Sequence, residues 1–123
     1  MKRRPINLDF TTIRFPVTAW VSILHRLSGF FIFALIPLLL WMLQASLASE
    51  AQFMALHDKL RQPIILGILW AFLSAIFYHL VAGLRHLLLD IHIGESKREA
   101  RYSAFATLLI SALGSLLLGY WLW

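Results

Sequence analysis

Three long stretches without Lys, Arg, Asp or Glu dominate the hydrophobic pattern of this chain. They cover residues 27–49, 62–84 and 102–123. A helix rises about 1.5 Å per residue, so a helix over each stretch can cross a hydrocarbon layer about 30 Å thick. The pattern therefore predicts an all-α membrane protein that forms one membrane-anchor domain, residues 1–123. The three expected transmembrane helices are residues 16–48, 62–89 and 102–123.

Polar segments and prolines set the limits of the expected helices. Residues 1–15 are expected to form a cytoplasmic tail followed by an interfacial segment, and Pro16 suits the first turn of a helix. Pro37 lies in the middle of the first span and predicts a kink. Residues 91–101 are expected to be a polar connection. Close helix approach is expected at Gly83, Gly114 and Gly119.

The basic residues are unevenly distributed along the chain. Of eleven Lys and Arg, five lie in the N-terminal segment through Arg26, four lie at the second loop, and two lie in the first loop. The positive-inside rule therefore places the N-terminus and the second loop in the cytoplasm and the C-terminus in the periplasm. The distribution of the basic residues therefore relates the net charge of +5 to orientation in a membrane and not to nucleic-acid binding.

The composition narrows the class of protein further. Sixty per cent hydrophobic residues and a mean hydropathy of +0.76 exclude an ordinary soluble domain. Because the chain has no Cys, it cannot itself hold a disulfide, a thiolate nucleophile or a cysteine-ligated iron–sulfur cluster. Residues 46–48 resemble a signal-peptide cleavage site, but the apolar run before them is too long for a signal peptide. An Arg- and Ser-rich transit segment is missing, so a bacterial inner membrane is expected.

His79 is the first candidate site residue, because it lies inside the second span. It precedes Arg85 by six residues, which places it roughly 9 Å below the cytoplasmic boundary. A neutral imidazole there is a good axial ligand for haem iron. The alternative is a histidine hydrogen-bonded to a serine or a carbonyl of a neighbouring helix, and His79 alone does not decide between them. His86 lies two turns further on the same face, with Gly83 between them leaving room for a porphyrin edge, so the three residues together favour a haem site.

A haem b in a membrane bundle usually takes two axial histidines, and only His79 lies at a suitable depth. His25 and His86 are expected near the cytoplasmic interface, His92 in the second loop, and His57 on the opposite side. If haem is bound, its second axial ligand is therefore expected from another chain. The haem-ligand hypothesis thus includes an obligate partner.

Ser22, His25 and Arg26 form a second candidate group near the start of the first helix. Ser22 and Arg26 are four residues apart and share a helix face. Arg26 could pair with haem propionates, and with Ser22 it could hold the carbonyl oxygens of a quinone. The residues alone favour the alternative of an arginine that reaches lipid phosphates and a serine bonded to its own helix. Asp90 is a candidate proton relay or, alternatively, an interfacial carboxylate paired with a Lys or Arg.

Two segments together resemble the signatures of a known family. The first contains RPINLD at 4–9, IRFPVTA at 13–19 and SILHRLSG at 22–29, and the second contains HLVAGLRH at 79–86, followed by Asp90. They resemble the cytochrome b556 membrane-anchor subunit of bacterial succinate dehydrogenase. The sequence similarity ends near Asp90. Beyond that residue, only the plan of three transmembrane helices is shared with the family. Pro37 departs from the family's first span and affects the expected straightness of that helix.

The resemblance implies a subunit of respiratory complex II, in which a flavoprotein subunit oxidises succinate and an iron–sulfur subunit passes electrons to a membrane quinone. Two anchor subunits hold that assembly and share one haem b. By this resemblance His79 is one axial ligand, and the second anchor subunit supplies the other. Ser22 and Arg26 would line the ubiquinone site, His25 and Arg26 would lie near the haem propionates, and Asp90 would belong to a proton route.

Two other functions fit parts of the pattern. A fumarate reductase anchor has the same architecture and runs the reaction in the opposite direction, which the sequence separates poorly from succinate oxidation. A small transporter or pore subunit needs a polar path through the bundle, whereas the third expected helix has only scattered Ser and Thr. An electron-transfer subunit therefore remains the main hypothesis.

Overall fold

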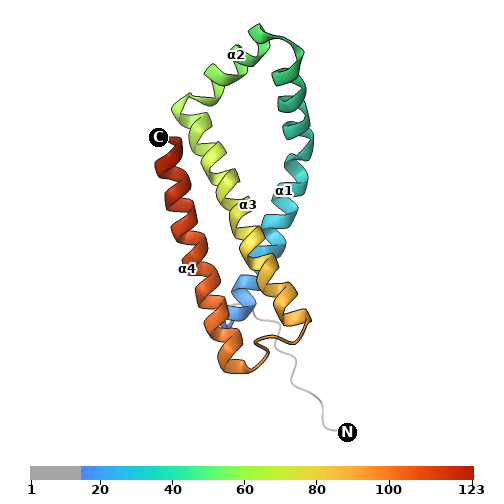
Figure 1. Ribbon diagram of the computed structural model, residues 1–123, viewed down its shortest axis with the longest axis vertical. Coiled ribbons are helices and arrows are strands. Elements are labelled where there is room, and N and C mark those ends of the chain that lie inside the picture. The colour runs from blue at the N-terminus through green and yellow to red at the C-terminus, as the bar shows by residue number, and fades with distance from the viewer. Residues whose placement is uncertain (1–14) are drawn as a thin grey trace.

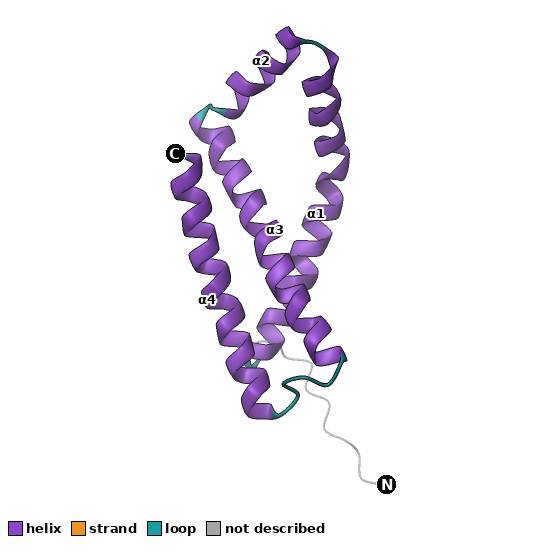
Figure 2. Cartoon of the chain, viewed as in Figure 1, coloured by secondary structure: helices purple, strands orange, loops and turns teal. Residues whose placement is uncertain are grey.

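The computed structural model describes residues 15–123, which form helices joined by short connections (Figures 1 and 2). Three of these helices are long and apolar enough to cross a membrane, which confirms the predicted all-α plan with three apolar helices over the described range. The predicted tail and interfacial segment lie outside the described residues except for Phe15. The helices are α1 (Val17–Ala48), α2 (Glu50–Leu60), α3 (Pro63–Asp90) and α4 (Lys97–Leu122).

α2 is a helix that the pattern of apolar spans does not predict. It follows α1 after the single residue Ser49, whose Oγ accepts a hydrogen bond from the Gln52 N–H at 3.2 Å. The Ser-x-x-Gln spacing is that of a capping box, so a local signal for this helix is present in the sequence. α2 connects the end of α1 to the start of α3 (Figure 1).

The connection between α3 and α4 is shorter than the predicted polar segment 91–101. α4 begins at Lys97, five residues before the expected start of the third span. Ser96 caps the helix by accepting a hydrogen bond from the Glu99 N–H at 3.2 Å, which is again the spacing of a capping box. Gly94 has φ +77° and supplies the left-handed backbone of the turn. The first turns of α4 are thus a charged extension of the apolar span.

α3 is the central helix of the bundle. Figure 1 shows it between α1 and α4, with the first half of α1 crossing it and the second half of α1 diverging from it. Pro37 lies within α1 without interrupting the helix. The start of α1 and the α3–α4 connection share one end of the molecule, while α2 and the C-terminus lie at the other end (Figure 1).

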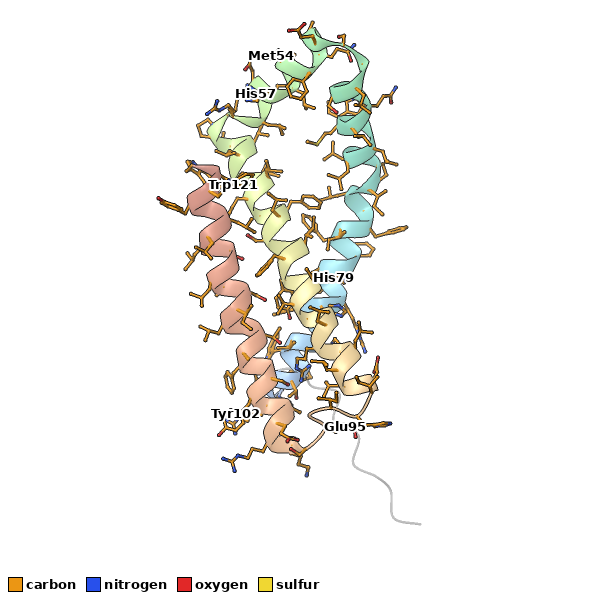
Figure 3. The ribbon with its side chains drawn as sticks, viewed as in Figure 1. Met54, His57, His79, Glu95, Tyr102 and Trp121 are labelled. Carbon is orange, nitrogen blue, oxygen red and sulfur yellow. The ribbon has the colours of Figure 1, made fainter. Side chains whose placement is uncertain are left out.

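Few apolar side chains are buried inside this single chain. Large apolar side chains cover its outside, as Figure 3 shows, and Phe30 and Phe33 on α1 are 74% and 72% exposed. Such a surface requires lipid or another protein chain against it. The buried apolar side chains of the described residues are Val21, Phe72, Ala82 and Ala104.

α3 and α4 approach closely at two glycines of α4, as expected from the sequence. A Cβ added at Gly114 would lie 2.0 Å from Cε1 of Phe77, and one at Gly119 would lie 3.1 Å from Nε1 of Trp70. The same indole Nε1–H donates a hydrogen bond to the Ser115 backbone oxygen at 2.8 Å. Aromatic rings of α3 therefore occupy the space that these glycines leave open.

Gly114→Ala is expected to destabilise the packing of α3 on α4 by about 1–3 kcal/mol, because the new methyl group must displace the Phe77 ring. Gly67→Ala is the matched control, since a Cβ at Gly67 has nothing within 4 Å. The control should be neutral or stabilise the helix by up to about 1 kcal/mol. Thermal unfolding in mild detergent compares the two variants, and equal melting temperatures would contradict the close packing at Gly114.

Candidate functional site

Three imidazoles meet where α1 crosses α3, and we call them the imidazole cluster (His25, His79 and His86). The rings of His25 and His79 are stacked, with centroids 4.2 Å apart and planes at 15°. The rings of His25 and His86 have centroids 4.9 Å apart and planes at 40°. Figure 3 shows His79 on the part of α3 that lies against α1. The structure thus brings together all three histidines that the sequence assigns to the haem site.

The hydrogen bonds of His79 assign the proton on its ring. Its Nδ1 lies 3.1 Å from the backbone oxygen of His25 and 3.0 Å from Oγ of Ser28. Because a carbonyl oxygen can only accept, Nδ1 carries the proton and donates it. Nε2 then keeps its lone pair, and it forms no hydrogen bond with a described residue. These are the serine and carbonyl contacts of the alternative interpretation, but they use only one of the two ring nitrogens.

His86 contributes a second nitrogen without a partner. Its Nε2 is buried and makes no hydrogen bond within the described part of the chain. A buried polar atom in this state calls for an explanation, such as a group that binds there. The imidazole cluster therefore contains two ring nitrogens without a hydrogen-bond partner among the described residues.

Two glycines make room for the imidazole cluster. A Cβ at Gly29 would lie 2.9 Å from Cε1 of His79, so the ring rests directly on the α1 backbone. A Cβ at Gly83 would lie 3.4 Å from Nε2 of His25. The sequence interpretation assigns the space at Gly83 to a porphyrin edge, whereas in the structure the imidazole of His25 lies against it.

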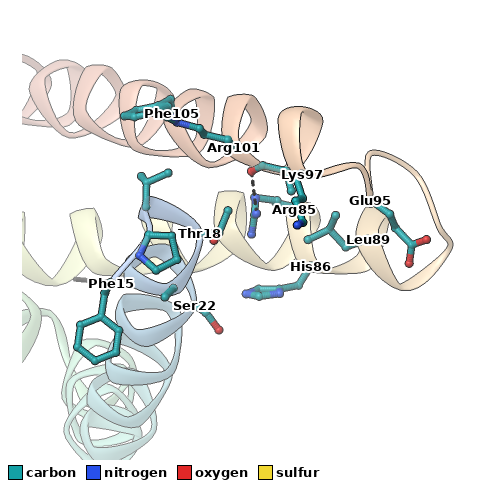
Figure 4. Close-up of a pocket in the computed structure, with 14 residues that line it drawn as sticks. Phe15, Thr18, Ser22, Arg85, His86, Leu89, Glu95, Lys97, Arg101 and Phe105 are labelled. Carbon is teal, nitrogen blue, oxygen red and sulfur yellow. Dashed lines mark hydrogen bonds between the residues drawn. The ribbon is translucent and has the colours of Figure 1, made fainter. Parts of the chain in front are cut away.

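A cavity of about 1300 Å³ lies between the start of α1, the end of α3 and the start of α4. Ser22 and His86 both line it, together with Arg85 (Figure 4). Lys97 and Arg101 of α4 add basic side chains to the same cavity. Ser22 of the second candidate group and His86 of the imidazole cluster thus border one space.

Arg85 is a site residue that the hydrophobic pattern marks only as a boundary. Its side chain is buried between α3 and α4. Nε donates a hydrogen bond to Oγ of Ser103 at 3.0 Å, and Nη2 donates one to the Ala100 backbone oxygen at 3.1 Å, the bond visible in Figure 4. A buried guanidinium beside His86 could be inferred only from the packing of α4, which the sequence pattern leaves open.

Arg26 and Asp90 lie outside the imidazole cluster. Both residues are exposed, and neither forms an ion pair or a side-chain hydrogen bond with another residue in 15–123. Ser22 and Arg26 are one helical turn apart, but only Ser22 lines the cavity. The single chain therefore places Ser22 at the cavity and Arg26 on its surface.

The family model described as succinate dehydrogenase/fumarate reductase transmembrane subunit matches residues 1–118. This chain belongs to that family. It is similar to succinate dehydrogenase cytochrome b556 subunits from Coxiella burnetii (41% identical over 122 residues, 98% of both chains), Paracoccus denitrificans (34% over 103 residues, 84% of this chain and 79% of the relative) and Rickettsia typhi (33% over 116 residues, 94% and 90%).

Membership of the succinate dehydrogenase/fumarate reductase transmembrane family confirms the resemblance that the two motifs carry. Together with three apolar helices, it identifies a multi-pass membrane protein. The structure packs the described part of the first motif, on α1, against the second motif, on α3. Tyr78, just before the second motif, donates its O–H to the Val21 backbone oxygen at 2.8 Å and so helps to set the register of the two helices.

Proposed function

We propose that this chain is the haem b-binding anchor subunit of a succinate:quinone oxidoreductase. The observation that carries the proposal is the placement of His79 between α1 and α3, with Nδ1 within hydrogen-bond distance of two oxygens of α1 and Nε2 without a partner among the described residues. The relatives' name, cytochrome b556 subunit, implies haem b. In this function the chain transfers electrons and anchors other subunits, while succinate is oxidised elsewhere in the complex.

The residues of the imidazole cluster fit a haem b. His79 would hold the iron through Nε2, because its Nδ1–H is already donated to the protein in the manner of a metal-ligating histidine. His25, His86 and Arg26 would donate hydrogen bonds to the propionates, which would give the buried Nε2 of His86 a partner. When bound, haem b accepts and releases single electrons.

A second anchor subunit is proposed to supply the other axial ligand. His25 and His86 are assigned to the propionates, so the described part of this chain offers one iron ligand. The exposed Phe30 and Phe33 belong to an apolar face of α1 against which the helices of such a partner can pack. A haem held between two chains would also stabilise their association.

Ubiquinone is proposed to bind near Ser22 and Arg26. The hydroxyl and the guanidinium are donors suited to the two carbonyl oxygens of a quinone, and the Arg26 side chain is accessible in the single chain. Reducing a quinone takes two electrons and two protons. Asp90, exposed at the end of α3, is proposed to carry protons from the aqueous boundary to this site.

The end of the molecule that carries the α3–α4 connection is proposed to face the cytoplasm of a bacterium, with the C-terminus in the periplasm. Lys97, Arg98 and Arg101 lie at this end, whereas Lys59 and Arg61 lie at the other. The iron–sulfur and flavoprotein subunits would dock on the cytoplasmic end, beside the imidazole cluster. The bacterial relatives support an inner-membrane location.

A quinol-oxidising fumarate reductase is the second candidate function, because the family description covers both enzymes. The three relatives named above are all subunits of succinate dehydrogenase, which favours succinate oxidation. The preferred quinone separates the two candidates, since menaquinol is the stronger reductant for fumarate and ubiquinone is the better acceptor from succinate.

Purification through an affinity tag on this chain, in mild detergent, tests the proposed function. The expected product contains a flavoprotein subunit, an iron–sulfur subunit, a second small membrane subunit and haem b. It should reduce ubiquinone with succinate faster than it reduces menaquinone. A colourless chain without companion subunits would be inconsistent with the proposal, and ion flux through liposomes containing the chain alone would point to a pore.

A further inference from the structure

We propose that Ser28 is a positioning residue that holds His79 in the tautomer and orientation required for iron ligation. This inference rests on the proposed haem ligation by His79. Ser28 lies on α1, whereas His79 lies on α3, so the contact between them also links the two helices. The residue does not touch the iron, and its effect is transmitted through the imidazole of His79.

The hydroxyl of Ser28 has one proton, and a hydrogen bond within α1 uses that proton. Its O–H donates to the His25 backbone oxygen at 2.8 Å. Oγ can therefore act only as an acceptor toward Nδ1 of His79, 3.0 Å away. Ser28 is 9% exposed, so water does not readily replace this contact.

The alternative tautomer of His79 is disfavoured by the same atoms. With the proton on Nε2, the lone pair of Nδ1 would face the His25 carbonyl oxygen at 3.1 Å, and neither atom could donate. A Ser28 O–H turned to donate to Nδ1 would give up its own bond to the same carbonyl oxygen. Nε2 would also have no lone pair for iron. The acceptor pair formed by Ser28 Oγ and the His25 oxygen thus selects the ligating tautomer.

Gly29 adds a steric constraint to this hydrogen-bonded one. The Cε1 edge of His79 faces Gly29, where even a Cβ would come within 2.9 Å. The ring therefore has one edge on the α1 backbone and Nδ1 on two oxygens. Removing the hydroxyl leaves the His25 oxygen as the single acceptor for Nδ1–H and weakens the restraint on the orientation of the ring.

The hydrogen bond should also affect the electronic properties of a bound haem. An acceptor on Nδ1–H increases the basicity of Nε2, and a more basic ligand favours the ferric over the ferrous state. Loss of the Ser28 hydroxyl should therefore raise the midpoint potential of the haem. It should also lower haem affinity by about 10- to 100-fold, the usual effect of losing an outer-shell partner.

Ser28→Thr and Ser28→Val are the deciding pair of variants, because their side chains have the same shape and only threonine keeps a hydroxyl. Both are compared with the wild type in the complex isolated through this chain, together with Ser28→Ala. Redox titration gives the midpoint potential, and low-temperature EPR of the ferric haem reports the orientation of the axial imidazoles. Ser111→Ala on α4 is the control, since Oγ of this buried serine has no hydrogen-bond partner among the described residues.

The expected result is a wild-type potential and EPR signal in Ser28→Thr and in the control. Ser28→Val and Ser28→Ala should show a raised potential, a shifted EPR signal and lower haem content. Equal potentials and signals in the threonine and valine variants would overturn the role of Ser28, even if Ser28→Ala failed to assemble. If the wild-type complex held no haem, or if His79→Ala kept an unchanged spectrum, the proposed function itself would fail, which is a separate outcome.

Discussion

Replacing His79 by alanine is expected to remove most of the haem b from the purified complex. Losing an outer-shell partner lowers metal affinity by about 10- to 100-fold, and losing an iron ligand should lower haem affinity further. Any haem that remains would have one protein ligand and an open coordination position. The haem-to-flavin ratio measures the loss, and carbon monoxide binding to the reduced complex detects the open position.

His57→Ala is the control for this experiment. His57 lies on α2 at the opposite end of the molecule, so its removal should leave haem content and spectrum unchanged. If His79→Ala kept full haem content, and carbon monoxide still did not bind, another residue would have to ligate the iron. Loss of haem in both variants would indicate a general failure of assembly, which the flavin content of the preparation would reveal.

Arg26→Leu is expected to slow ubiquinone reduction by about tenfold to a hundredfold, because a hydrogen bond from a charged donor contributes about 1.5–3 kcal/mol. Ser22→Ala is expected to slow it by about two- to tenfold, because a hydrogen bond from a neutral donor contributes about 0.5–1.5 kcal/mol. Arg26 should give the larger effect, since it loses a charged donor. Oxidation of succinate with a water-soluble dye, which accepts electrons before the quinone site, should stay at the wild-type rate. The ratio of the two rates isolates the quinone step.

Arg61→Leu provides a matched loss of positive charge at the α2 end of the chain. It should leave both rates unchanged. A wild-type ubiquinone rate in Arg26→Leu and Ser22→Ala would remove these residues from the quinone site. An equal fall in both assays would indicate weaker docking of the soluble subunits instead.

The long helices are predictable because the membrane imposes a length on uncharged segments. α1 and α3 begin and end within about one residue of the limits that Pro16, Pro63 and the polar residues indicate, in keeping with the usual uncertainty of helix ends. The pattern of apolar spans predicts neither α2 nor the early start of α4. Their signals, Ser49 and Ser96 at capping-box positions, are local and independent of hydrophobicity.

The candidate site is predictable only in part, for a physical reason. His79 and His86 are found because an ionisable ring in an apolar helix is costly and their spacing places them on one face. Ser28 and Arg85 depend on which residues of α1 and α4 face α3 at the same height. Spacing along one helix does not determine the register between two helices. Close contacts between helices, such as the one between Gly114 and Phe77, set that register.

Haem ligation by the Nε2 of His79 can be tested most directly by supplying the ligand separately. In a complex carrying His79→Gly, the missing side chain leaves space for free imidazole beside Gly29. Ligation by His79 predicts that the variant prepared without imidazole holds little haem and lacks the low-spin absorption spectrum of the wild type, and that imidazole supplied together with haem restores both. A variant that keeps the wild-type low-spin spectrum before imidazole is added would contradict it.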